Sequence, residues 1–234
     1  MFKKNICLVT VMAMFVGCVQ KNPELETYDL SNHWFNIKSL NDNKVLLNKN
    51  IVVQYTDGIK TSSYEDFNIY KKNVTDRNQI EEYTFFEDIN KSNYKKMMSN
   101  KSMDLKYNIL ENEIKETYLE ENQTSSYKRN IKFNDKVIEE RDVDGSTLNC
   151  TLSNYYDNLN VKDKINSFFN AKYLSVDKNY NNVMELQCKD SFVDGEYYIF
   201  MAKDVGTIFF MRKDKDDGST ESSYSILDSQ TIIE

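Results

Sequence analysis

Four Asp-Gly pairs divide the chain, at positions 57–58, 144–145, 194–195 and 217–218. Each pair lies beside stretches that are rich in aromatic and β-branched residues. Glycine accepts positive φ angles and aspartate tolerates them, so an Asp-Gly pair between such stretches is typical of a tight hairpin turn. Because hairpin turns join antiparallel strands, the repeated pair predicts a mainly β protein with antiparallel pairing.

The stretches between these turns have the alternation or the apolar content of β-strands. We predict strands at residues 51–55, 64–71, 80–86, 105–110, 114–119, 127–133, 137–143, 148–152, 183–188, 197–201, 207–212, 223–227 and 230–233. Residues 161–171 have helical spacing instead: Val161, Ile165, Phe168 and Phe169 share one face, and Asn160 is the expected N-cap. A weaker apolar stripe predicts a second short helix within residues 91–99.

These elements predict a single β-rich domain, residues 31–234. We expect an antiparallel curved sheet or half-barrel with one or two short helices, and a β-sandwich is the alternative. The 16 tyrosines and 13 phenylalanines supply bulky side chains that favour strands and bury large areas. Those aromatic residues either fill the core or line a cavity for an apolar ligand, and the sequence leaves both readings open.

The first eighteen residues, MFKKNICLVTVMAMFVGC, join a basic start, an apolar run and a glycine directly before Cys18. This order is typical of a secretory signal peptide, and the run is shorter than the roughly 20 apolar residues that span a membrane. The stretch Phe15-Val16-Gly17-Cys18 resembles the lipobox of bacterial lipoproteins, although Phe15 stands where leucine is commonest. The resemblance implies cleavage before Cys18 and attachment of acyl chains to its thiol.

On this interpretation, residues 1–17 are a signal peptide and residues 18–30 are a lipid-anchored tether. Val19 follows Cys18 where an aspartate would imply retention at the inner membrane, so the resemblance implies an outer-membrane destination in a Gram-negative organism. The acyl chains would provide the membrane contact, because a net charge of −7 disfavours binding to anionic lipid. An ordinary signal peptide with an incidental cysteine is the alternative.

The other cysteines divide by position. Cys7 lies in the signal peptide, and Cys150 and Cys188 remain in the exported domain. Both alternate with apolar residues, which places their sulfur atoms on the apolar faces of their strands. One pair of cysteines in an exported chain predicts a structural disulfide between Cys150 and Cys188, and two separate buried thiols are the alternative.

Charge and residue content exclude several functions. The acidic balance argues against a nucleic-acid partner, since such proteins neutralise phosphates with Lys and Arg. The sole histidine, His33, leaves no His-rich metal site and restricts any Ser-His-Asp device to that residue. Neighbouring acids such as Glu81 and Glu82 point to opposite sides of a strand, so we interpret them as solvated surface. We predict no enzyme, no metal and no cofactor.

Residues 197–214, YYIFMAKDVGTIFFMRKD, resemble a hairpin found in exported β-rich bacterial proteins, among them lipid-binding half-barrel lipoproteins. The matching residues are Ala202, Lys203, Val205 and Gly206. The leading hypothesis is therefore a non-enzymatic envelope lipoprotein that binds a lipid, another apolar ligand or an envelope protein. The alternative is a surface interaction protein, such as an adhesin, an inhibitor or an immunity factor. A hydrolase would need convergent carboxylates in a cleft.

Overall fold

The computed structural model describes residues 40, 44–73, 75–76, 78–109, 113–118, 128–133, 137–141, 147–169, 176–191, 195–216 and 219–233. The predicted signal peptide, Cys18, the tether and His33 lie outside these residues. The Asp-Gly pairs at 144–145 and 217–218 also lie outside them, as does Asp194 of a third pair.

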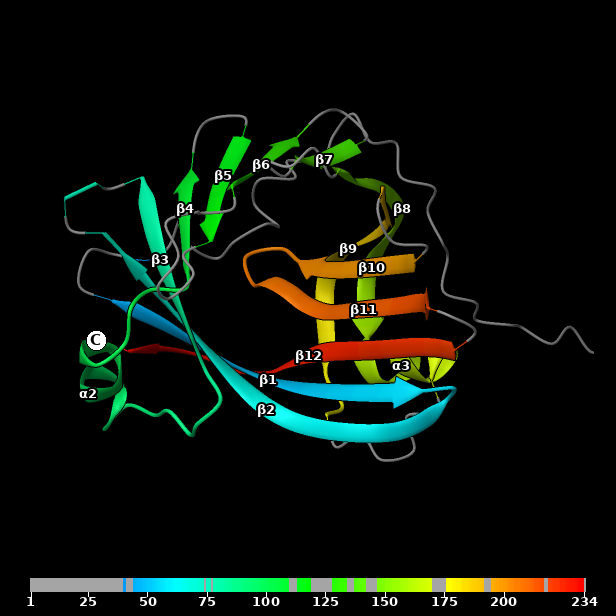
Figure 1. Cartoon of the computed structure of the whole chain (residues 1–234), viewed down its shortest axis with the longest axis horizontal. Helices are drawn as coiled ribbons and strands as arrows, with labels where there is room; N and C mark the ends of the chain where they lie inside the picture. The colour runs from blue at the N-terminus through cyan, green and yellow to red at the C-terminus, as the bar shows by residue number, and fades with distance from the viewer. Residues whose placement is uncertain are drawn as a thin grey trace, which may run out of the picture.

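The described residues form twelve strands and two helices (Figure 1). The strands are β1 (Val45–Thr56), β2 (Ile59–Lys72), β3 (Gln79–Phe85), β4 (Leu105–Ile109), β5 (Glu113–Tyr118), β6 (Lys128–Phe133), β7 (Val137–Arg141), β8 (Thr147–Asn160), β9 (Asn179–Asp190), β10 (Gly195–Ala202), β11 (Gly206–Asp216) and β12 (Ser219–Ile233). Helix α2 (Tyr94–Ser99) lies between β3 and β4, and α3 (Val161–Phe168) lies between β8 and β9.

The strands form one antiparallel sheet in which each pairs with its neighbours in sequence. β1 also pairs with β12, from Val45 opposite Ile233 to Thr56 opposite Glu221. The hydrogen-bonded order of the described strands therefore returns to its start, and the sheet closes on itself. The prediction of a mainly β, antiparallel, curved sheet with two short helices is confirmed. The two edge strands of the expected half-barrel, β1 and β12, pair with each other.

Several predicted boundaries differ from the structure. The stretches 223–227 and 230–233 are parts of one strand, β12. Strand β8 continues through residues 153–160, where no strand was predicted, and runs directly into α3. Helix α3 ends at Phe168, three residues before its predicted end, because Phe169 adopts an extended conformation.

Alternate residues of β10 contribute to two different hydrophobic clusters. Tyr197 and Met201 belong to an inner cluster, whereas Phe200 and Ala202 belong to a second cluster beside α3. The inner cluster also contains Ile80 and Tyr107 from β3 and β4, and these strands lie across the ring of strands from β10. The inner cluster therefore lies on the inner face of the closed sheet.

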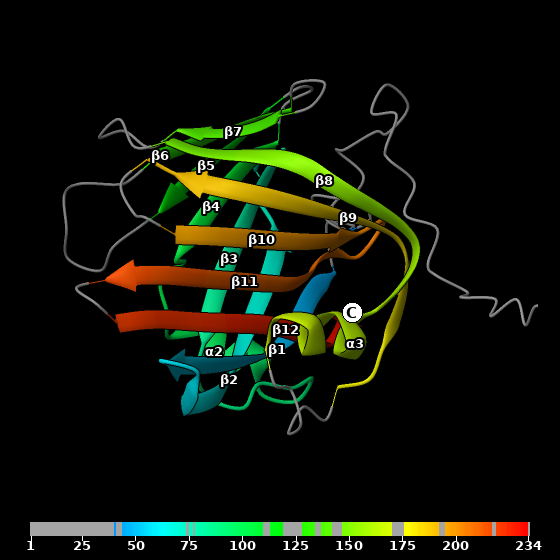
Figure 2. The same cartoon turned by 90° about the vertical axis from the view of Figure 1, so that its right-hand side faces the viewer.

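The two described helices cover the opposite, outer face of the sheet. Val161 and Ile165 of α3 are fully buried against β1 and β8–β12, and Tyr94 of α2 packs on Phe67 and Phe85. Figure 1 shows α2 and α3 near opposite ends of β1 and β12. Figure 2 shows β8 curving along the sheet until it reaches α3. Neither described helix is long and apolar enough to cross a membrane.

Cys150 and Cys188 form a disulfide with a sulfur–sulfur distance of 1.98 Å. The two residues are direct partners in the register of β8 and β9, and both side chains belong to the inner cluster. The predicted disulfide and the predicted apolar orientation of its sulfur atoms are confirmed. The alternative prediction, two separate buried thiols, is therefore wrong for Cys150 and Cys188.

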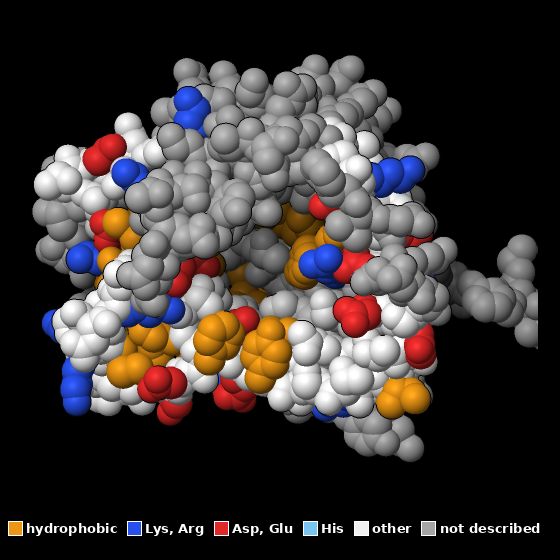
Figure 3. All heavy atoms as spheres, in the orientation of Figure 1, with side chains coloured by type: hydrophobic (Ala, Val, Ile, Leu, Met, Phe, Trp, Pro, Cys, Tyr) orange, Lys and Arg blue, Asp and Glu red, His pale blue; other side chains and the backbone are white. Residues whose placement is uncertain are grey.

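Figure 3 shows one face of the molecule, on which Lys and Arg side chains are dispersed among Asp and Glu. Hydrophobic side chains lie there in small groups, some in the central hollow and some along the lower edge. The described part of this face has no large patch of only positive or only negative side chains. This mixture corresponds to an ordinary solvated surface.

Candidate ligand-binding cleft

A tight turn between β1 and β2 forms one wall of a cleft. Asp57 and Gly58 both have left-handed backbone conformations, with φ angles of 50° and 77°, as the predicted Asp-Gly turn requires. The Asp57 amide donates a hydrogen bond of 2.8 Å to the Thr220 carbonyl oxygen, and the Thr220 amide donates one of 2.8 Å to Oδ1 of Asp57. These reciprocal bonds fix the turn to the start of β12.

The end of helix α3 and the residue that follows it form another wall of the cleft. Asn160 caps the helix as predicted, because its side-chain oxygen accepts a hydrogen bond of 3.0 Å from the Asp163 amide. Val161 and Ile165 hold the helix on the sheet, so Phe168 and Phe169 project beyond its buried stripe. Phe168 remains 36% exposed at this point.

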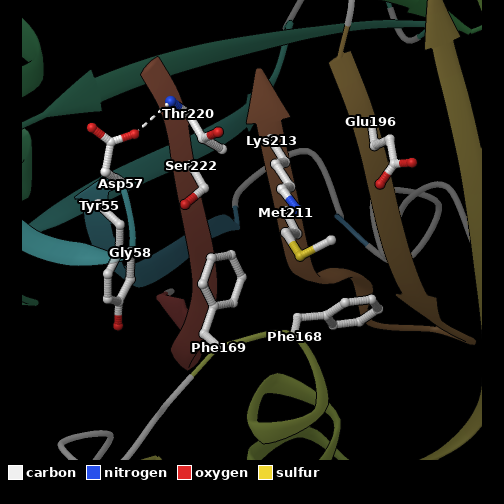
Figure 4. A pocket seen from close by; sticks show the side chains of 10 residues that line it. All are labelled: Tyr55, Asp57, Gly58, Phe168, Phe169, Glu196, Met211, Lys213, Thr220 and Ser222. Carbon is white, nitrogen blue, oxygen red and sulfur yellow. Dashed lines mark hydrogen bonds between the residues drawn. The ribbon is translucent and has the colours of Figure 1, made fainter. Parts of the chain in front are cut away.

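The cleft has a volume of about 560 Å³, within the roughly 300–1,000 Å³ usual for small-molecule sites. In Figure 4, the Phe168 and Phe169 rings lie at one end, Met211 lies at the centre, and Lys213 and Thr220 lie toward the other end. The lining residues are Tyr55, Asp57, Gly58, Phe168, Phe169, Glu196, Met211, Lys213, Thr220 and Ser222. The cleft therefore has one aromatic end and one polar end.

Contacts between rings hold the aromatic end in place. Tyr55 stacks on Phe169 with 5.2 Å between ring centroids, and Phe169 lies 5.3 Å from Tyr224. Phe168 lies 5.2 Å from Tyr198. Burial raises the pKa of Tyr224, and the neighbouring Tyr55 raises it further, so the Tyr224 phenol stays neutral at physiological pH. The aromatic end thus stays apolar.

A buried ion pair fastens α3 to β9. Nζ of Lys164 lies 3.1 Å from Oε2 of Glu185, and their side chains are 19% and 5% exposed. The same ammonium donates a hydrogen bond of 3.0 Å to the Tyr156 hydroxyl, which itself donates to Glu185. It also lies 5.1 Å from the centroid of the Phe168 ring. Lys164 therefore links the sheet to a ring that lines the cleft.

A second polar group lies inside the closed sheet, around Glu82. This residue is 6% exposed, so the expectation that it lies on the solvated surface is wrong. Its carboxylate accepts hydrogen bonds from the Tyr107 hydroxyl and, at 2.6 Å, from Nδ2 of Asn68. Neighbouring Glu81 accepts its own hydrogen bonds from Asn73 and Tyr83, so the predicted separation of the two carboxylates is confirmed.

The stability of the protein is expected to depend on pH through Glu82. Burial raises the pKa of Glu82 above its ordinary value, although hydrogen bonds from Tyr107 and Asn68 partly oppose this shift. Between the ordinary and the raised pKa, the folded protein keeps a proton that the unfolded chain has released. This proton therefore contributes its full share of the free energy of unfolding below the ordinary pKa of Glu82. The contribution is lost as the pH rises through the raised pKa of the folded protein.

The variant Glu82→Gln should therefore lose less of its free energy of unfolding than the wild type as the pH rises above the ordinary pKa of 4.5. Urea denaturation of both proteins across this range measures the difference. Parallel pH profiles for the two proteins would contradict the assignment.

The comparisons with known proteins gave no result: no family model, no curated protein and no solved structure matches this chain. Among the described residues, no group of three or more His, Cys, Asp or Glu side chains is placed to hold a metal ion.

Sequence reasoning predicted two parts of the cleft without joining them, namely the turn at Asp57-Gly58 and the aromatic end of the 161–171 helix. It missed Met211, Lys213 and Glu196, because their strands give no local sign that these side chains face α3 and the β1–β2 turn. The cysteine pair lies apart from the cleft, in the inner cluster.

Proposed function

We propose that this chain is a lipid-anchored, non-enzymatic lipoprotein of the bacterial cell envelope, and that its cleft binds an apolar or amphipathic ligand. The supporting observation is the aromatic end of the cleft, where Tyr55, Phe168, Phe169 and Met211 line part of a small-molecule-sized volume. Apolar surface in a concave site gains free energy when a ligand removes it from water.

The envelope location rests on the sequence of residues 1–18, with acyl chains on Cys18 as the membrane anchor. The disulfide supports export, since such bonds persist in oxidising compartments. The outer membrane is the destination that Val19 implies if the organism is Gram-negative. We propose no nucleic-acid partner and no cofactor.

A surface interaction protein is the second candidate, and one observation favours it. Tyr64 and Phe86 are 41% and 71% exposed, and their rings lie 6.1 Å apart on the outside of the molecule. Exposed aromatic residues can anchor a protein partner. Isolated exposed apolar residues are nevertheless common, and this pair has no concave surface around it among the described pockets. The cleft therefore gives the stronger proposal.

The ligand proposal predicts extra mass on the protein when residues 22–234 are exported to a bacterial periplasm and purified gently. A native mass spectrum should show a species that leaves on denaturation and extracts as lipid. Phe168→Ala should weaken binding about fivefold, because the exposed part of the ring would lose its contact with the ligand. Phe86→Ala is the matched control, with an exposed phenylalanine removed outside the cleft.

A clean mass for the wild-type protein, or equal loss of ligand in both variants, would count against a ligand in the cleft. In that case, loss of an envelope protein from pull-downs with Phe86→Ala, but not with Phe168→Ala, would identify the interaction function.

The anchor proposal predicts that Cys18→Ala moves the full chain out of the membrane fraction, because no thiol remains for acylation. Fractionation of cells expressing the wild type and the variant tests this prediction, with Cys7→Ala as the cysteine control. Equal membrane retention of Cys18→Ala and the wild type would refute the anchor.

A further inference from the structure

The charges at the polar end of the cleft define its ligand more narrowly. Lys213 on β11 and Glu196 on β10 are direct partners in the strand register, and both are exposed. Opposite charges at such positions usually attract each other. Here neither side chain forms an ion pair or a hydrogen bond with any other residue that the structure describes. Both charges therefore face the cleft without a described partner.

Neighbouring charges do not replace these missing partners. Arg212 and Asp214 flank Lys213 in sequence, but alternate residues of a strand point to opposite faces, and these two pair with each other. Asp57 lines the cleft as well, yet its carboxylate already accepts the hydrogen bond from the Thr220 amide. Lys213 and Glu196 are thus the charged side chains of the cleft lining that have no hydrogen bond or ion pair among the described residues.

From this arrangement we infer that the cleft takes a single-chain amphiphile with a zwitterionic head. The inference rests on the proposed ligand-binding function. The tail lies over Met211 and between the rings of Phe168 and Phe169, at the apolar end seen in Figure 4. The anionic group of the head lies at Lys213, and its cationic group lies at Glu196.

Other heads fit the same charges less well. An anionic head gains the attraction of Lys213 but is repelled by Glu196, and a neutral head pairs with neither charge. An exposed ion pair contributes up to about 1 kcal/mol, which corresponds to about a fivefold change in a dissociation constant. We therefore expect a measurable but moderate preference for a zwitterion.

Calorimetric titration with three lauroyl amphiphiles tests the inference, each below its micelle concentration. The probes are lysophosphatidylethanolamine, lysophosphatidylglycerol and monolauroylglycerol, which have zwitterionic, anionic and neutral heads on the same tail. The protein is the full chain with Cys18→Ala, so that no acyl chain of its own competes. The zwitterionic probe should bind about fivefold more tightly than either of the others.

The variants Lys213→Gln and Glu196→Gln should each reduce this preference, because each leaves only one charge for the zwitterionic head to pair with. Lys203→Gln is the control, because this exposed lysine lies in the β10–β11 turn and does not line the cleft. Glycerophosphoethanolamine, which has the head without the tail, should bind much more weakly than the lysolipid.

Equal affinity for the three lauroyl probes would overturn the zwitterionic head and leave the proposed apolar site intact. Tightest binding of the anionic probe, sensitive to Lys213→Gln alone, would also overturn it in favour of an anionic head. Equal binding of the tailless head would overturn the amphiphile. Failure of every probe would overturn both the inference and the proposed function.

Discussion

Replacing Lys164 by methionine should lower the free energy of unfolding by about 3–5 kcal/mol. Methionine keeps most of the aliphatic chain but removes the ammonium, which leaves the Glu185 carboxylate buried without its cation. Asn154 still donates a hydrogen bond of 3.0 Å to this carboxylate, yet a neutral amide only partly offsets the missing charge. Guanidinium denaturation of the variant and the wild type measures the loss.

Two further variants separate this effect from a general weakness of α3. Lys162→Met removes a half-buried lysine of the same helix that forms no ion pair with a described residue, so its effect should be small. The double variant Lys164→Met with Glu185→Gln should recover at least half of the lost stability, because no unpaired charge remains. Equal losses in Lys162→Met and Lys164→Met would contradict the importance of the ion pair.

Reduction of the disulfide should cost a similar amount of stability. Cys150 and Cys188 are 38 residues apart in sequence, and the chain-entropy model gives about 4 kcal/mol for a bridge that closes a loop of this length. The reduced protein keeps the volume of both sulfur atoms, so the change reports the crosslink rather than a cavity. Denaturation of the oxidised and the reduced protein measures it directly.

The double variant Cys150→Ala with Cys188→Ala provides the control, since its stability should not respond to reductant. Alkylation of the unfolded but unreduced wild type, followed by peptide mapping, should leave both cysteines unmodified. Alkyl groups on Cys150 and Cys188 would show that the bond is absent, and the predicted difference in stability would then have no cause.

Local patterns were sufficient to predict much of this fold. Alternation located most strands, the Asp57-Gly58 pair located the first hairpin, and Asn160 with the stripe at Val161 and Ile165 located α3. The Cys150–Cys188 pair followed from strand alternation together with the predicted export. Each of these predictions depends on residues near one another in sequence, where the physical preference acts directly on the backbone.

What the sequence did not reveal depends on distant residues. Residues 153–160 are mostly polar, and they form the second half of β8 because β9 lies alongside to pair with them. Burial of Glu82 depends on Tyr107, which lies 25 residues further along the chain. The cleft combines four strands and the β1–β2 turn with the end of α3, so no single stretch of sequence carries its pattern.

The pairing of β1 with β12 also determines when the chain can complete its fold. Val45 and Ile233 are partners although nearly the whole described chain separates them, and contacts of such long range form slowly. The chain emerges from its N-terminus, so β12 follows the other described strands, and β1 and β11 each present an unpaired backbone edge until β12 is available. Open edges of this kind pair readily with strands of other chains, so aggregation is a hazard of the emerging chain until β12 pairs with both edges.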